Sequence, residues 1–319
     1  MKSTLSLEQY VDGIKKQNRA ILAKAITLIE SSLKEHQLLA RELIREILPL
    51  TGNAQRIGIS GTPGVGKSTF IEHFGMKSIE QGHTLAVLAI DPTSQLTGGS
   101  ILGDKTRMQK LSAHADAFIR PSSNGDSLGG VAAKTFEVML LCDAFGFDRI
   151  FIESVGVGQS EIALSNICDF FILLMQPGSG DELQGIKRGI LEVSDLVIVN
   201  KADGDNLPQA KIAKHDYENA LSVLKAKSSW PPKVLLCSSL EKTGFEAIEE
   251  TIQEYYSKYF QIDFRHKKIK VWLKEIMIQQ FKTKILKSKK IEDQIDKIIL
   301  SSEDMLTDID RLYERLVHD

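Results

Sequence analysis

Cysteine and long apolar runs are scarce in this sequence. Its 319 residues include three cysteines, Cys142, Cys168 and Cys237, and none belongs to a C-x-x-C pair. Cysteines scattered in this way predict neither a disulfide framework nor a zinc site, and they are typical of a reducing cytosol. The longest apolar runs, such as residues 170–175, are far shorter than a membrane span. We therefore expect no membrane as a partner.

A net charge of one sign is also missing. The 40 Lys and Arg residues nearly balance the 42 Asp and Glu residues, which leaves a formal charge of −2. No global field draws the chain to nucleic acid, so we expect no nucleic-acid partner. The first residues lack the apolar core of a secretory signal, which favours a cytoplasmic location. The length suffices for one large α/β domain with appendages.

Short apolar runs alternate with helical stretches between residues 51 and 261. Several of these runs are apolar throughout, which is typical of parallel strands buried on both faces. The alternation predicts an α/β domain with a doubly wound, mostly parallel sheet that binds its ligand at the carboxyl ends of the strands. The expected strands are 56–60, 85–90, 117–119, 149–153, 170–175, 196–199 and 234–237.

Helical segments are expected on both sides of this domain. Residues 1–50 carry apolar side chains at helical spacing, with one helix expected over 37–48. Residues 265–290 contain ten Lys or Arg and one acid, whereas residues 291–319 contain nine acids and three basic residues. We expect residues 262–319 to form a helical arm for dimerisation, with basic and acidic helices paired within or between chains. The alternative is two solvated faces packed on the same domain.

The most informative motif is a phosphate-binding P-loop of the form G-x-x-x-x-G-K-[ST] between an expected strand and an expected helix. In such a loop backbone N–H groups cradle phosphate oxygens, and the helix N-terminus favours anions. Lys67 would reach the β- and γ-phosphates, and the Ser68 hydroxyl would ligate Mg²⁺. The candidate phosphate-binding residues are Gly61, Thr62, Pro63, Gly64, Val65, Gly66, Lys67, Ser68 and Thr69.

A second motif points to guanine. Asn200, Lys201 and Asp203 form an N-K-x-D pattern directly after an expected strand. A carboxylate at Asp203 would accept hydrogen bonds from the guanine N1–H and 2-amino groups, and adenine offers no matching donors. Asn200 would brace the loops, and the Lys201 stem would cover the base. The last base-contacting loop is expected at Ser238, Ser239 and Leu240.

Three acids complete the expected phosphate side. Asp91 and Glu153 stand at strand ends, and Asp104 lies in a polar, glycine-rich stretch that is a candidate switch. With Lys67 they are the candidate catalytic residues, and with Ser68 they are the candidate ligands of Mg²⁺. Which acid orients the attacking water is left open. Gly156 is expected to donate a backbone N–H to the γ-phosphate. GTPases usually carry Asp at the position of Glu153, so this residue departs from the general pattern.

Together these motifs resemble one family, the GTPases associated with methylmalonyl-CoA mutase. These are proteins of the MeaB and MMAA type, formerly described as lysine/arginine/ornithine transport ATPases (ArgK). The resemblance covers nearly the whole chain, and residues 153–161 and 98–108 carry its most specific strings. Thr93 and Ser154 depart from the residues common in the family, but both keep a hydroxyl. The further matching segments are 61–69, 91–94, 128–130 and 200–203.

The resemblance implies a P-loop G domain and a homodimer formed through the C-terminal extension. It implies hydrolysis of GTP to GDP with Mg²⁺, served by Lys67, Ser68, Asp91, Asp104 and Glu153. It further implies a chaperone that gates adenosylcobalamin loading or protection of methylmalonyl-CoA mutase or a related acyl-CoA mutase. Residues 176–184 would form a segment that contacts the mutase. The sequence does not name the client enzyme.

Other P-loop proteins remain as alternatives. A metal-insertion GTPase of the nickel-chaperone type shares the fold but needs imidazole or thiolate ligands, and the seven His and three Cys are scattered here. A small-molecule kinase lacks the guanine-reading motif. An energising ATPase of an amino-acid transporter should prefer adenine, which Asp203 disfavours.

Overall fold

The computed structural model describes residues 5–90, 108–121, 128–154, 160–178, 188–224, 229–286 and 288–301, with positions 304, 307–308, 310–311 and 314. The chain divides into two compact units, Met1–Trp272 and Leu273–Asp319. Among the helices of these described residues, none is both long and apolar enough to cross a membrane.

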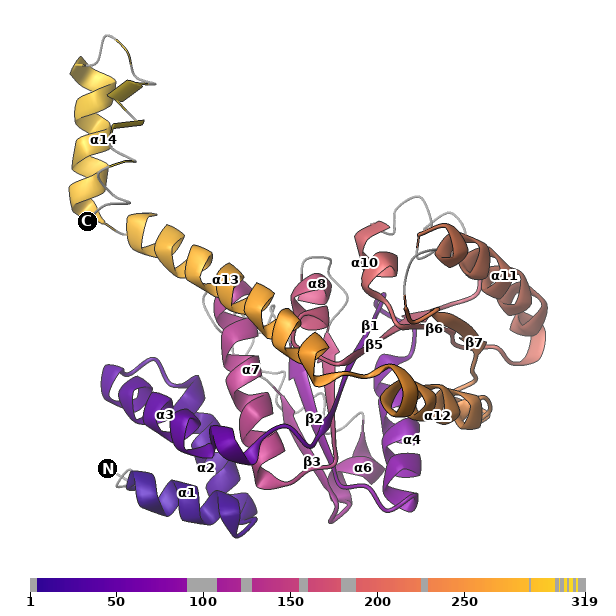
Figure 1. The fold of residues 1–319 in the computed structure, drawn as a ribbon. Coiled ribbons are helices and arrows are strands. Elements are labelled where there is room, and N and C mark those ends of the chain that lie inside the picture. Colours follow the sequence, from indigo (N-terminus) through magenta and orange to yellow (C-terminus); the bar gives the residue numbers. More distant parts are fainter. Residues whose placement is uncertain are drawn as a thin grey trace. The chain divides into compact units, whose positions relative to one another are not determined.

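A seven-stranded parallel sheet lies at the centre of the first unit (Figure 1). Its strand order is β3-β2-β4-β1-β5-β6-β7, so the chain winds from β1 to one edge and then to the other. All seven predicted strands are confirmed, with small shifts at their ends. The strands are β1 (Gln55–Gly61), β2 (Leu85–Ile90), β3 (Ala117–Pro121), β4 (Arg149–Ser154), β5 (Phe170–Met175), β6 (Leu196–Val199) and β7 (Lys233–Leu236).

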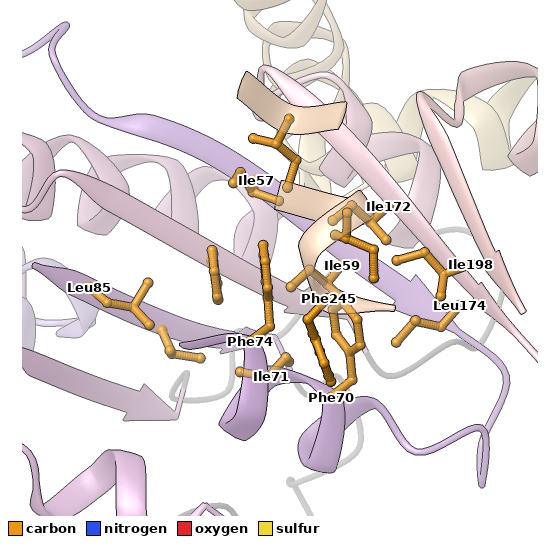
Figure 2. Close-up of a cluster of buried hydrophobic side chains, with 14 of the residues drawn as sticks. Ile57, Ile59, Phe70, Ile71, Phe74, Leu85, Ile172, Leu174, Ile198 and Phe245 are labelled. Carbon is orange, nitrogen blue, oxygen red and sulfur yellow. The ribbon is translucent and has the colours of Figure 1, made fainter. Parts of the chain in front are cut away.

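One face of the sheet packs against α4 (Lys67–Glu80) and α12 (Phe245–Glu254). Alternate strand residues point to this face, because successive side chains of a strand project to opposite sides. Phe70 and Phe74 of α4 and Phe245 of α12 stack with one another over Ile59 and its neighbours (Figure 2). These side chains are fully or almost fully buried, and they hold α4, the helix that begins at the P-loop, against the sheet.

The opposite face is covered by α7 (Leu128–Phe145), α8 (Ser160–Ser165), α10 (Arg188–Val193) and α11 (Leu207–Leu224). Apolar side chains of β5 and β6 pack against α10 and α11 on this side. Helices on both faces confirm the predicted doubly wound α/β class. Among the described residues of the first unit, the further short elements are η1 (Leu48–Leu50), α6 (Gln109–Ala113), the turn η2 (Gly204–Asn206) and the π-helical turn η3 (Tyr255–Tyr259).

The N-terminal segment is helical, as predicted. Its helices α1 (Leu7–Lys15), α2 (Arg19–Glu30) and α3 (Lys34–Ile47) pack on one another and on α7. The side chain of Ser6 caps α1 in a capping box with Gln9. The helix expected over 37–48 begins earlier, at Lys34, and gives way to η1, which contains a proline.

The C-terminal segment is also helical in the described residues. It contains α13 (Ile262–Leu286) and α14 (Lys289–Ser301). The predicted domain boundary at residue 262 coincides with the first residue of α13, whereas the division between compact units falls inside this helix. The domain boundaries at residues 51 and 262 stay predictions.

Candidate nucleotide-binding site

The P-loop runs from the last residue of β1 to the first turn of α4. Gly66 has φ +96°, and a Cβ there would lie 2.8 Å from Nδ2 of Asn200. Gly61 has φ +157°, and a Cβ there would lie 2.4 Å from the carbonyl oxygen of Leu174. Both positions therefore require glycine, for backbone conformation at Gly66 and for space at both. Val65 is fully buried and anchors the loop in the core.

The side chain of Lys67 forms hydrogen bonds with the loop that precedes it. Its Nζ donates to the carbonyl of Gly61 over 2.7 Å and to the carbonyl of Thr62 over 3.2 Å. Burial lowers the pKa of Lys67, and the nearby carboxylates of Glu153 and Glu161 oppose this shift. The ammonium group thus lies at the P-loop, where two acids are close enough to influence its pKa.

Asn200 joins three loops at the carboxyl edge of the sheet. Its Nδ2 donates to the carbonyl of Val65 in the P-loop over 2.8 Å. Its Oδ1 accepts from the backbone N–H of Ser239 over 3.1 Å and from the Ser239 hydroxyl over 2.9 Å. Asn200 is 1% exposed, so these bonds form in a buried setting where they are strongly favoured. Both ends of this amide therefore bond to neighbouring loops.

Other residues that the sequence predicts to contact the base are also brought together. Ser238 Oγ donates to Oδ2 of Asp203 and accepts from the backbone N–H of Glu241 over 3.0 Å. Lys201 takes a left-handed backbone conformation with φ +58°, and its Nζ donates to the carbonyl of Gly64 over 2.7 Å. The two motifs, more than 130 positions apart in sequence, therefore share hydrogen bonds.

Glu153 lies near the end of β4 and is 8% exposed, close enough to Lys67 to influence its pKa. Ser68 and Thr69 lie in the first turn of α4. Asp91, Asp104 and Gly156 lie outside the described residues, as do positions 179–184 of the expected mutase-contacting segment. Leu240 lies beside Ser239 with its side chain 80% exposed.

Glu161 is a residue that sequence reasoning did not single out as part of the site. It lies in the first turn of α8 and is 1% exposed, and its negative charge raises the pKa of Lys67. Its signal in the sequence was its place at the end of the 153–161 string, where a charged residue follows a glycine-rich stretch. Only the packing of α8 beside β1 and β4 brings it near the P-loop.

The donor chemistry of this edge suits a hard divalent cation. Ser68 and Glu153 offer a hydroxyl and a carboxylate, the oxygen ligands that Mg²⁺ prefers together with phosphate oxygens and water. Within the described residues, no group of three or more His, Cys, Asp or Glu could hold a metal by itself. Thr62 Oγ1 in the P-loop is buried with no hydrogen-bond partner among these residues, so it is free to bond a ligand. The residues present thus fit a nucleotide that brings its own metal ligands.

Comparison with known proteins gives a consistent result. The family model described as "Methylmalonyl Co-A mutase-associated GTPase MeaB" matches residues 22–293. The GTPase ArgK of Escherichia coli is 48% identical over 80% of this chain and 77% of its own length. The mouse methylmalonic aciduria type A homolog, a mitochondrial protein, is 43% identical over 86% of this chain and 72% of its own length. A putative GTPase of Caulobacter vibrioides is 56% identical over 72% of this chain and 71% of its own length.

Solved structures agree at the level of the fold. The crystal structure of a LAO/AO transport system kinase covers 98% of this chain and 99% of its own, with a TM-score of 0.79 and 34% identity. HypB from Helicobacter pylori, solved with nickel, covers 72% of this chain and 98% of its own at a TM-score of 0.50 and 18% identity, which shows a shared fold alone. With the P-loop bound to a guanine-type loop, these matches place the chain in the methylmalonyl-CoA mutase-associated GTPase family, and it is a GTPase that binds GTP and GDP.

Proposed function

We propose that GTP hydrolysis by this chain gates the loading or protection of adenosylcobalamin in a B12-dependent acyl-CoA mutase. The observation that carries the nucleotide part is the Asn200 junction, which binds the P-loop to the Ser239 loop in one buried network. The proposed client is suggested by the names of the family and of the mouse relative. Methylmalonyl-CoA mutase is the first candidate client.

Asp203 would recognise the guanine base and the Lys201 stem would cover it. Ser238, Ser239 and Leu240 would complete the pocket. The Ser238 hydroxyl orients the Asp203 carboxylate by donating to Oδ2, and both carboxylate oxygens keep a lone pair for the guanine donors. The amides of residues 61–69 would hold the phosphates, and Gly156 would add one N–H at the γ-phosphate. A single rigid network would thus sense both ends of the nucleotide.

Lys67 would act at the reacting phosphate. The ammonium donates to two P-loop carbonyls, so a bound γ-phosphate would exchange these neutral acceptors for negatively charged phosphate oxygens. Positive charge there stabilises the transition state, because negative charge develops on the transferred oxygens. Glu153, with Asp91 and Asp104, would position the attacking water.

Mg²⁺ would be held by Ser68 together with Glu153, Asp91 or Asp104. When bound, it neutralises charge on the β- and γ-phosphates. The first helical turn supplies the hydroxyl, and the end of β4 supplies a buried carboxylate, so the protein contributes few ligands and leaves the rest to phosphate and water.

We further propose that residues 262–319 form a homodimerisation arm. In the second unit, Met277 and Ile278 are 68% and 65% exposed, and Leu273 and Phe281 are about half exposed. Apolar side chains gathered on a helix in this way favour association with another helix. A cytoplasmic location accords with three cysteines that are all unpaired and buried.

The function is tested by recovering the client from the host. Tagged protein is incubated with host lysate and a non-hydrolysable GTP analogue or GDP, and bound proteins are identified by mass spectrometry. Recovery of a cobalamin-dependent mutase in one nucleotide state supports the proposal. Lys67→Ala serves as the control, because it removes the cation at the phosphates and should abolish the difference between the two states.

The opposite result would be equally clear. A transporter or a nickel enzyme recovered in place of any mutase would contradict the proposed pathway and leave the GTPase assignment intact. A second assay with purified methylmalonyl-CoA mutase would then measure whether adenosylcobalamin transfer depends on GTP hydrolysis. Transfer at equal rates with GTP and with the analogue would contradict gating by hydrolysis.

A further inference from the structure

Two buried serine hydroxyls meet where β1 and β4 reach the nucleotide site. Ser154 Oγ donates to Ser60 Oγ over 2.7 Å, and neither residue has exposed surface. Ser60 immediately precedes Gly61, where the P-loop begins, and Ser154 immediately follows Glu153. The hydroxyl pair therefore joins the strand end that carries the phosphate loop to the strand end that carries the candidate acid.

The pair lies just beyond the backbone ladder of these two strands. The register of β1 with β4 ends with Ile59 opposite Glu153. One residue further, Ser154 is in register with Ile90 of β2, and Ser60 is in register with β5. The side-chain hydrogen bond thus extends the connection between β1 and β4 past the point where their own register ends.

The pair also lies on the face away from the P-loop helix. Ile59 packs in the cluster that contains Phe70 and Phe74 of α4, so its register partner Glu153 projects to that same face. Ser60 and Ser154, next in each strand, project to the face that α7 and α8 contact. A hydrogen bond on the face that α7 and α8 contact can therefore set the spacing of β1 and β4 without occupying the face that carries Glu153 and the P-loop helix.

Stability alone does not require hydroxyls at these positions. A buried hydroxyl without a partner costs free energy, whereas two small apolar side chains would fill the space without that risk. A hydrogen bond instead imposes a defined distance and direction between two atoms. We propose that Ser60 and Ser154 are positioning residues for GTP hydrolysis, whose mutual hydrogen bond holds the carboxyl end of β4 against the P-loop. The proposal rests on the nucleotide site assigned above.

The test is a double-mutant cycle on turnover. Ser60→Ala and Ser154→Ala are each expected to lower kcat at saturating GTP about tenfold. Removing a hydrogen bond that orients a neighbouring active-site group typically has an effect of this size. The affinity for GDP should stay nearly constant, because the P-loop and the Asn200 junction are intact. The double variant should be no slower than either single variant, since the bond is lost only once. Ser154→Thr keeps the hydroxyl and should retain turnover.

Two controls separate positioning from folding. Ser165→Ala removes another buried hydroxyl, one that donates to the Ile162 carbonyl within α8, and should leave kcat unchanged. Thermal unfolding of every variant shows whether the folded state persists. The double variant leaves no unpaired hydroxyl, so it tests the bond even where a single variant unfolds.

Three results would overturn the proposal: wild-type kcat in both alanine variants, additive losses in the double variant, or equal losses in kcat and GDP affinity. Glu153→Gln, measured in parallel, tests the acid separately. Wild-type turnover in Glu153→Gln beside slow serine variants would contradict the role proposed for Glu153 and support the hydroxyl pair.

Discussion

Arg265 and Asp169 form a buried two-point ion pair between the start of α13 and the residue before β5. Nε and Nη2 of Arg265 donate to the two carboxylate oxygens over 2.8 and 2.5 Å. The same guanidinium donates to the carbonyls of Gly52 and Ala54, just before β1. The first turns of the predicted arm are thus bound to the amino end of the strand that carries the P-loop at its other end.

This ion pair predicts a large loss of stability on truncation. Arg265→Ala should lower the free energy of unfolding by about 3–5 kcal/mol, because the Asp169 carboxylate is left buried and uncompensated. Urea denaturation monitored by circular dichroism measures the change. Lys16→Ala, which breaks an exposed pair with Asp12, is the matched control and should cost less than about 1 kcal/mol. Equal effects in the two variants would contradict the prediction.

Asp203→Asn should change the preferred base. The asparagine amide would face the guanine 2-amino group, donor against donor, whereas xanthine offers a carbonyl at the same position. We expect GDP affinity to fall at least about 100-fold and xanthosine diphosphate affinity to rise, as measured with fluorescent nucleotides. Asp205→Asn, an exposed acid two residues further on, is the control and should bind GDP normally. Unchanged GDP affinity in Asp203→Asn would argue against the guanine pocket.

Ionisation of Glu249 should make the free energy of unfolding depend on pH. Burial opposes its ionisation, but the hydrogen bonds from Arg149 outweigh burial and lower the pKa of Glu249 below its usual 4.5. A lowered folded-state pKa gives stability that is present above pH 4.5 and is lost as pH falls through the folded value. Glu249→Gln should therefore be clearly less stable than the wild type at pH 7.

The difference in the free energy of unfolding between the wild type and Glu249→Gln should narrow as the pH falls below 4.5, because the wild-type carboxylate then becomes protonated and loses its charge. Urea denaturation across this pH range measures it. Glu250→Gln, at an exposed site on the same helix, serves as the control. A gap between wild type and Glu249→Gln that stays constant with pH would contradict the assignment.

The arm predicts a dimer that two charges would disrupt. Met277→Glu together with Ile278→Glu places carboxylates on the exposed apolar part of α13, and we expect the variant to be monomeric where the wild type is dimeric. Light scattering coupled to size-exclusion chromatography measures the mass. Lys274→Glu changes charge on the same helix without removing apolar surface and should remain dimeric. A wild-type chain that is monomeric at micromolar concentration would refute the proposed arm.

Much of this molecule was determined by the sequence alone. The apolar runs of β2, β5 and β6 were predicted to the residue, because a strand buried on both faces must be apolar throughout and polar turns limit it. The P-loop and the guanine-type motif were found because their chemistry needs particular residues at fixed local spacing.

Only the tertiary structure decided how distant residues meet. Asn200 reaches Val65, and Ser154 reaches Ser60, because parallel strands end at the same edge of the sheet, a pairing that no local pattern contains. Arg265 belonged by composition to a basic arm, yet its partner is Asp169, 96 positions away. A buried charge is stabilised only by the particular opposite charge that folding brings to it, and that choice is a property of packing in three dimensions.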